Sequence, residues 1–154
     1  MTSFQLSNND ARLVYLALQY HLARPGSELD PDTKQPSEQG LAGVARALEP
    51  QLEKAVATIE LSDYQRQRLV SAVAGSMNEL KTYPLLVGGG QTTMPAFYKT
   101  LGRLFPEVQE EPEEASQLAA HLMALRRRLE RAPAEASAAP QRRPWWRFWQ
   151  RGGA

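Results

Sequence analysis

The chain has 154 residues, of which 42% are hydrophobic and 23% charged, the proportions of one ordinary folded domain. It contains no cysteine, which excludes disulfides, thiolate metal sites and cysteine catalysis. No apolar run approaches the ~18 residues of a membrane-spanning helix, and the N-terminal segment MTSFQLSNND lacks the features of a signal peptide. We therefore expect a cytoplasmic protein.

Charge divides the chain into two unequal parts. Residues 1–135 carry 14 Lys/Arg and 17 Asp/Glu, a net charge of −3, whereas residues 136–154 carry four arginines and no acidic residue. All three tryptophans also lie in this last stretch. The C-terminal stretch therefore carries the sharpest functional signal in the sequence, and the remainder is expected to be a folded body.

Apolar residues at helical spacing begin near the N-terminus. A first helix is predicted from about Ser7, a favourable N-cap, to about Ala23, with apolar residues on most of its faces. Residues 24–40, with three prolines and two glycines, are predicted to form a polar loop. A one-sided apolar stripe predicts a second helix over about 38–59, with a kink or a break into two helices at Pro50.

The third predicted helix has the clearest start signal. It begins at Ser62, where Gln65 completes a capping box, and is predicted to end at Pro84. Residues 85–93, LLVGGGQTT, read as a flexible connector.

Two further helices are predicted after the connector. The fourth has Pro95 in its first turn and ends at Pro106. The fifth covers about 112–131, with glutamates at its start and arginines at its end, as the helix dipole favours.

No strand pattern and no internal repeat is found, so an all-α fold is predicted. It consists of a single bundle of four to five helices over residues 5–131, a disordered Ala/Pro linker over 132–141 and a short Trp/Arg-rich tail over 142–154.

Residues that could carry metal chemistry are sparse. His21 and His121 lie on separate predicted helices, and neither has a His, Cys or Glu partner at ligand spacing. Asp30 begins a segment similar to a calcium loop, but Gln35 and Leu41 stand where glycine and glutamate are required. We expect no metal site here and a turn-forming role for Asp30.

Catalytic and cofactor motifs are also missing. The glycines at 88–90 belong to neither a P-loop nor a dinucleotide fingerprint, although Thr92, Thr93 and Lys99 are where we would expect an anion to bind the body. No serine-hydrolase motif occurs. The sequence thus predicts a non-enzymatic protein without cofactors.

A basic cluster closes the fifth predicted helix. Two interpretations compete: a nucleic-acid patch, or a solvated helix end that complements the helix dipole. The second is favoured, because no DNA-binding motif surrounds the cluster and the body is acidic. The cluster consists of Arg126, Arg127, Arg128 and Arg131.

The tail alternates arginines with aromatic rings. On a helical wheel the rings share one arc and Arg147 and Arg151 lie opposite, with Pro144 as the first helical residue. So short a helix is unstable alone in water and needs a surface. The predicted binding residues are Arg142, Arg143, Trp145, Trp146, Arg147, Phe148, Trp149 and Arg151.

The segment RRPWWRFWQR resembles short Trp/Arg-rich host-defence peptides in composition, and this resemblance implies a preference for membrane surfaces. Tryptophan favours the bilayer interface, and arginine is attracted to anionic lipid. A groove on a protein partner, single-stranded nucleic acid and packing on the chain's own body remain open as alternatives.

These features predict a non-catalytic adaptor or scaffold protein. Its body would bind an unknown protein, another copy of the chain being one option, while the tail holds it reversibly at an anionic membrane surface, at the inner face. The alternative is a nucleic-acid-associated accessory protein that uses the basic cluster and the tail.

Overall fold

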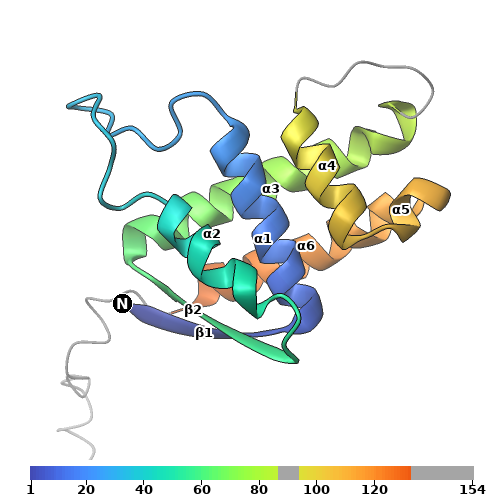
Figure 1. Cartoon of the computed structure of the whole chain (residues 1–154), viewed down its shortest axis with the longest axis horizontal. Helices are drawn as coiled ribbons and strands as arrows, with labels where there is room; N and C mark the ends of the chain where they lie inside the picture. Colours follow the sequence, from blue (N-terminus) through green and yellow to red (C-terminus); the bar gives the residue numbers. More distant parts are fainter. Residues whose placement is uncertain (87–93, 133–154) are drawn as a thin grey trace, which may run out of the picture.

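The computed structural model describes residues 1–86 and 94–132. Residues 87–93 of the predicted connector, most of the linker and the whole tail lie outside these residues. The elements in chain order are β1 (Thr2–Ser7), α1 (Asn8–Ala23), α2 (Ala42–Leu48), the 3₁₀ turn η1 (Glu49–Gln51), β2 (Val56–Leu61), α3 (Asp63–Leu86), α4 (Pro95–Leu104), α5 (Glu107–Glu110) and α6 (Glu114–Arg131). The described chain is therefore mostly helical, with one small sheet (Figure 1).

Helix α1 is the central element of the fold, with α2, α3 and α4 packed around it (Figure 1). It begins where predicted, because the Ser7 hydroxyl accepts a hydrogen bond of 3.2 Å from the N–H of Asp10. Its side chains are buried on several faces, as the sequence predicts; the fully buried ones are Ala11, Leu13, Val14, Leu16, Ala17 and Leu18.

The expectation that the chain has no strand is wrong. Strands β1 and β2 form an antiparallel ladder that runs from Thr2 opposite Leu61 to Ser7 opposite Val56. Alternate side chains enter the core, among them Phe4 and Leu6 from β1, as a half-buried sheet requires. The ladder lies along one edge of the molecule, below α1 and α2 in Figure 1.

The second predicted helix is also corrected. Helix α2 starts at Ala42 rather than near residue 38, and at Pro50 the chain passes through η1 instead of continuing as a second helix. Residues 56–59 belong to β2, because pairing with β1 supplies backbone hydrogen bonds that a helix would otherwise make internally.

Helix α3 carries the predicted capping box. The N–H of Gln65 donates to Ser62 Oγ at 3.1 Å, and the N–H of Ser62 donates to Gln65 Oε1 at 3.0 Å. The helix does not end at Pro84 but continues to Leu86. A proline removes one backbone hydrogen bond, which the last turn of a 24-residue helix tolerates.

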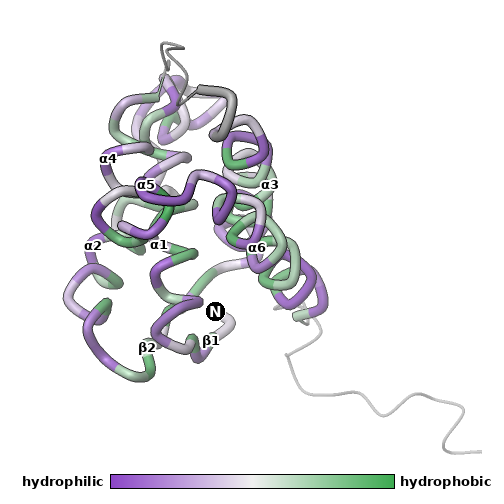
Figure 2. Tube along the Cα trace, turned by 90° about the vertical axis from the view of Figure 1, so that its right-hand side faces the viewer, coloured by the Kyte–Doolittle hydropathy of each residue, from purple (hydrophilic) through white to green (hydrophobic). Residues whose placement is uncertain are grey.

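Helices α3 and α6 run side by side on one side of the molecule, with α1, α2 and α4 opposite (Figure 2). The contact between α1 and α3 is close, because a Cβ on Gly75 would lie under 3.0 Å from the ring of Tyr20. Helix α4 starts at Pro95 as predicted, whereas the single turn α5 is an addition that the sequence did not indicate. The leucines of α6 are buried at Leu118, Leu122, Leu125 and Leu129.

Candidate functional site

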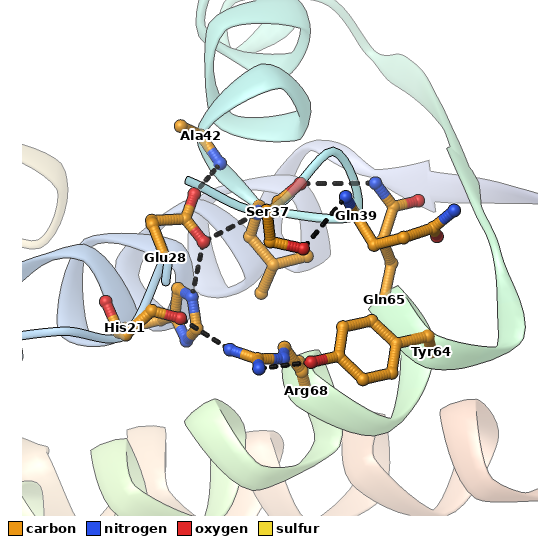
Figure 3. Close-up of polar contacts among 11 residues, drawn as sticks. His21, Glu28, Ser37, Gln39, Ala42, Tyr64, Gln65 and Arg68 are labelled. Atoms are coloured by element: carbon orange, nitrogen blue, oxygen red, sulfur yellow. Dashed lines mark hydrogen bonds and ion pairs between the residues drawn. The ribbon is translucent and has the colours of Figure 1, made fainter. Parts of the chain in front are cut away.

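The candidate site is built around the carboxylate of Glu28, which lies at the start of α2. Its Oε2 accepts a hydrogen bond from the N–H of Leu41 at 3.0 Å, and its Oε1 accepts one from the N–H of Ala42 at 2.6 Å. These N–H groups have no partner inside the helix, and a negative charge beside them is favoured by the helix dipole. Glu28 therefore stabilises the start of α2 from a distant position in the loop (Figure 3).

His21, from the last turn of α1, completes this arrangement. Its side chain is 7% exposed, and its Nε2 lies 2.9 Å from Oε2 of Glu28. Gly40 makes the close approach possible, since a Cβ there would lie 2.8–3.0 Å from the carboxyl group of Glu28. The loop that links α1 to α2 is thus fixed at both ends.

Two opposing effects set the pKa of Glu28. Partial burial raises it, but the hydrogen bonds from His21 and from the N–H groups of Leu41 and Ala42 together outweigh burial. The pKa of Glu28 therefore lies below its ordinary value, and the carboxylate is ionised at neutral pH.

Helix α3 reaches the same loop through Arg68. The guanidinium donates through Nη1 to the carbonyl of Ser27 and through Nη2 to the hydroxyl of Tyr64. It also lies over the Tyr64 ring, 4.6 Å from the ring centroid. Figure 3 shows these two contacts on the α3 side of the loop.

A second link joins the loop to the start of α3. Gln65 Nε2 donates to the carbonyl of Gly40 at 3.2 Å, and Ser62 Oγ donates to Oε1 of Gln39 at 2.6 Å. Together with Glu28 and Arg68, these bonds tie α1, α2 and α3 to one loop (Figure 3).

Two open pockets flank the Glu28–His21 pair. The larger, of about 570 Å³, is called here the acidic pocket, because its lining includes three carboxylates, Glu28, Glu38 and Glu60, against one cationic side chain, Arg46, and the N-terminal residue Met1. The smaller, of about 440 Å³, is called the basic pocket, because Arg24, Arg68 and His21 line it and no carboxylate does; its other lining residues are Pro25, Gly26, Ser27, Tyr64, Gln67, Ser71 and Ala72. The pair separates the two, with Glu28 on one side and His21 on the other.

The calcium-like segment is a turn. Asp30 Oδ1 accepts hydrogen bonds from the N–H of Asp32 at 2.8 Å and from the N–H of Thr33 at 3.0 Å. These bonds, that from Thr33 foremost, hold the pKa of Asp30 below its ordinary value. Among residues 1–86 and 94–132, no three His, Asp or Glu side chains gather as metal ligands would.

The basic cluster of α6 is partly neutralised. Arg126 pairs with Glu130 at 3.0 Å, and Arg128 pairs with Asp10 at 2.9 Å. Arg127 and Arg131 are exposed at the end of the helix. The structure thus does not gather the four arginines into one unpaired patch.

The other predicted positions are separate from the loop. Lys99 is exposed on α4, and His121 is exposed on α6. Thr92 and Thr93 lie outside the described residues, as do the tail residues Arg142, Arg143, Trp145, Trp146, Arg147, Phe148, Trp149 and Arg151. None of the described helices combines the length and apolarity needed to cross a membrane.

Sequence reasoning missed the Glu28–His21 pair and Arg68. Metal-ligand spacing along the helix does not reach the partner of His21, which lies seven residues away, in the loop. Arg68 and Ser27 are 41 residues apart, so only folding brings them together. The dense prolines and glycines of residues 24–40, which mark a shaped loop, were the available signal.

Comparison of the chain with protein-family models, with curated proteins and with solved structures finds no match. A functional assignment therefore depends on the chain's own residues.

Proposed function

We propose that this chain is a non-catalytic adaptor whose helical body, a single bundle, binds a protein while the C-terminal segment attaches it reversibly to an anionic membrane surface. The observation that carries this proposal is the composition of residues 142–151, which contain four arginines, three tryptophans and a phenylalanine without one acidic residue. Each arginine near an anionic surface contributes about 1 kcal/mol. The rings favour the interface, where their amphipathic character suits the headgroup level.

The place where the described chain ends supports the proposal. The last turn of α6 is held against the first turns of α3, because Nη1 of Arg66 donates to the carbonyl of Leu129 at 2.9 Å. Arg127 and Arg131 are exposed at this end. They add positive charge next to the point from which the linker continues, so this end of the body is suited to face an anionic surface.

A non-catalytic body is supported by the roles of its titratable groups. Glu28 and His21 are engaged with each other, and Glu28 also stabilises α2. Asp30 is engaged in its own turn. These groups have structural partners, and the body's proposed role is therefore binding, to a protein partner or to another copy of the chain.

The nucleic-acid alternative receives less support. Arg126 and Arg128 are paired with Glu130 and Asp10, which lowers the charge that a phosphate backbone would meet. Binding of the protein to single-stranded DNA or RNA is therefore tested beside its binding to vesicles.

The test is co-sedimentation of the full-length protein with vesicles of phosphatidylcholine alone or mixed with phosphatidylglycerol. A ring variant replaces Trp145, Trp146, Phe148 and Trp149 by alanine. A charge-matched control replaces the four tail arginines by lysine.

We expect the wild type and the lysine control to pellet with anionic vesicles and the ring variant to stay in the supernatant. Equal pelleting of the ring variant would show that the rings do not anchor the chain. Binding to single-stranded DNA or RNA with steep salt dependence, without vesicle binding, would favour the alternative.

A further inference from the structure

The basic pocket has a lining that is unusual for so acidic a body. Two arginines and a histidine line it, together with the polar side chains of Gln67 and Ser71, and no carboxylate does. Its volume of about 440 Å³ falls within the range of small-molecule sites. A cavity with this lining favours an anion over a cation or a neutral molecule.

The guanidinium groups of Arg68 and Arg24 differ in how firmly their surroundings hold them. Arg68 is fixed, since its Nη atoms reach Ser27 and Tyr64 and its plane lies on the Tyr64 ring. Arg24 is exposed and its guanidinium lies 5.9 Å from the centroid of the Tyr20 ring; within residues 1–86 and 94–132 this guanidinium has no hydrogen-bond or ion-pair partner. One cation is therefore held in position, and the other is free to close on a ligand.

The nearby carboxylates do not line this pocket. Glu28 points away from it, toward the N–H groups of α2, and is paired with His21. Asp30 accepts two backbone hydrogen bonds in its own turn. Asp30 also interacts electrostatically with Arg68, whereas the guanidinium of Arg24 has no ion-pair partner among the described residues, so its charge remains available to a ligand.

Phosphate is the anion that this set of donors fits best. Guanidinium groups present paired N–H donors to phosphate oxygens, and the amide of Gln67 and the hydroxyl of Ser71, about one and two turns from the start of α3, offer further donors on the same wall. We infer that the basic pocket, between the Arg24–Ser27 turn and the first turns of α3, binds the phosphate group of a small phosphate ester or a lipid headgroup. This inference does not depend on the proposed attachment through the tail.

Both sources of phosphate are compatible with the position of the pocket. Arg66, next to the pocket residue Gln67 in α3, donates to the carbonyl of Leu129 in the last turn of α6, so the first turns of α3 connect the pocket to the C-terminal end of α6. The experiment must therefore distinguish a soluble phosphate ester from a headgroup in a bilayer.

The test uses the full-length protein labelled with ¹⁵N and the ring variant defined above. Inorganic phosphate and glycerol 3-phosphate are titrated at constant ionic strength against chloride, and amide shifts are followed by NMR. The variant is Arg24→Gln, which leaves the contacts of Arg68 intact. The matched control is Arg46→Gln, an exposed arginine of the acidic pocket.

We expect saturable shifts at residues 24–27 and 67–71, a rise in Tm with phosphate, and at least a tenfold weaker affinity in Arg24→Gln but not in Arg46→Gln. Equal affinity in the ring variant would separate this site from the tail. Shifts produced only by anionic vesicles, and lost in Arg24→Gln, would identify a lipid headgroup as the source. The inference is overturned if neither phosphate nor vesicles shift these residues, or if both arginine variants lose affinity equally.

Discussion

Replacing Glu28 by alanine should destabilise the protein far more than replacing Glu38, an exposed glutamate of the same loop. The substitution removes the cap on the N–H groups of Leu41 and Ala42, which costs about 1 kcal/mol, within a range of about 0.5–2 kcal/mol. It also leaves the buried imidazole of His21 without its partner, at a cost of about 1–3 kcal/mol. The free energy of unfolding should therefore fall by about 2–4 kcal/mol, and Tm by about 10 °C.

The assay is urea unfolding followed by circular dichroism, with Glu38→Ala as the matched control. Glu38 is an exposed glutamate of the same loop, without a hydrogen bond to any residue that the structure describes, so its replacement should change stability by less than about 0.5 kcal/mol. Equal losses in the two variants would refute the capping role of Glu28.

The pH dependence of the free energy of unfolding tests the same role of Glu28. Because the folded pKa of Glu28 is depressed, its stabilising effect is fully present above the unfolded glutamate pKa of about 4.3 and disappears as pH falls through the lower folded value. The stability difference between wild type and Glu28→Gln should therefore be largest at neutral pH and should narrow in acid. A difference that stays constant through this range would contradict the assignment.

Three further predictions concern packing and charge. Gly75→Ala should lower the free energy of unfolding by about 1–3 kcal/mol, because the new Cβ would clash with the ring of Tyr20; an unchanged urea midpoint would show that α1 and α3 separate easily. Burial and the hydrogen bond to Glu79 raise the pKa of Tyr98, so ultraviolet titration should find one phenol that ionises above the usual range, lost in Tyr98→Phe. Arg128→Gln should cost no more than about 1 kcal/mol, with salt reducing the loss, because the ion pair is half-exposed; a larger, salt-independent loss would contradict this.

The parts of the fold that depend on neighbouring residues could be predicted from sequence. The cap at Ser7, the capping box of Ser62 and Gln65, and the start of α4 at Pro95 all involve residues within one turn of each other. Such signals need no knowledge of the tertiary structure.

The sheet could not be predicted in this way. Val56 and Ile59 are three residues apart, a spacing that fits the apolar stripe of a helix, although both residues lie in β2. The partner strand β1 lies about 50 residues earlier, and its pairing, not local propensity, decides the conformation. Six-residue strands are too short for alternation to outweigh a competing helical period.

The candidate site could not be predicted from the sequence for a related reason. Glu28 acts on His21 and on the start of α2, and Arg68 acts on Ser27, through contacts that form only when the loop folds back onto α3. Charged residues in a polar loop look alike in sequence, and their partners distinguish them. The sequence therefore indicated a shaped loop without indicating which of its carboxylates stabilises the fold.

The central proposal, attachment through the Trp/Arg tail, has a direct spectroscopic test. All three tryptophans, Trp145, Trp146 and Trp149, lie in the tail, so the intrinsic tryptophan emission of the full-length protein reports on this segment alone. Addition of anionic vesicles should shift the emission to shorter wavelength and expose it to a quencher carried on the lipid chains, because the rings enter the interface. An unchanged emission maximum, with quenching only by a water-soluble quencher, would contradict membrane attachment by this tail.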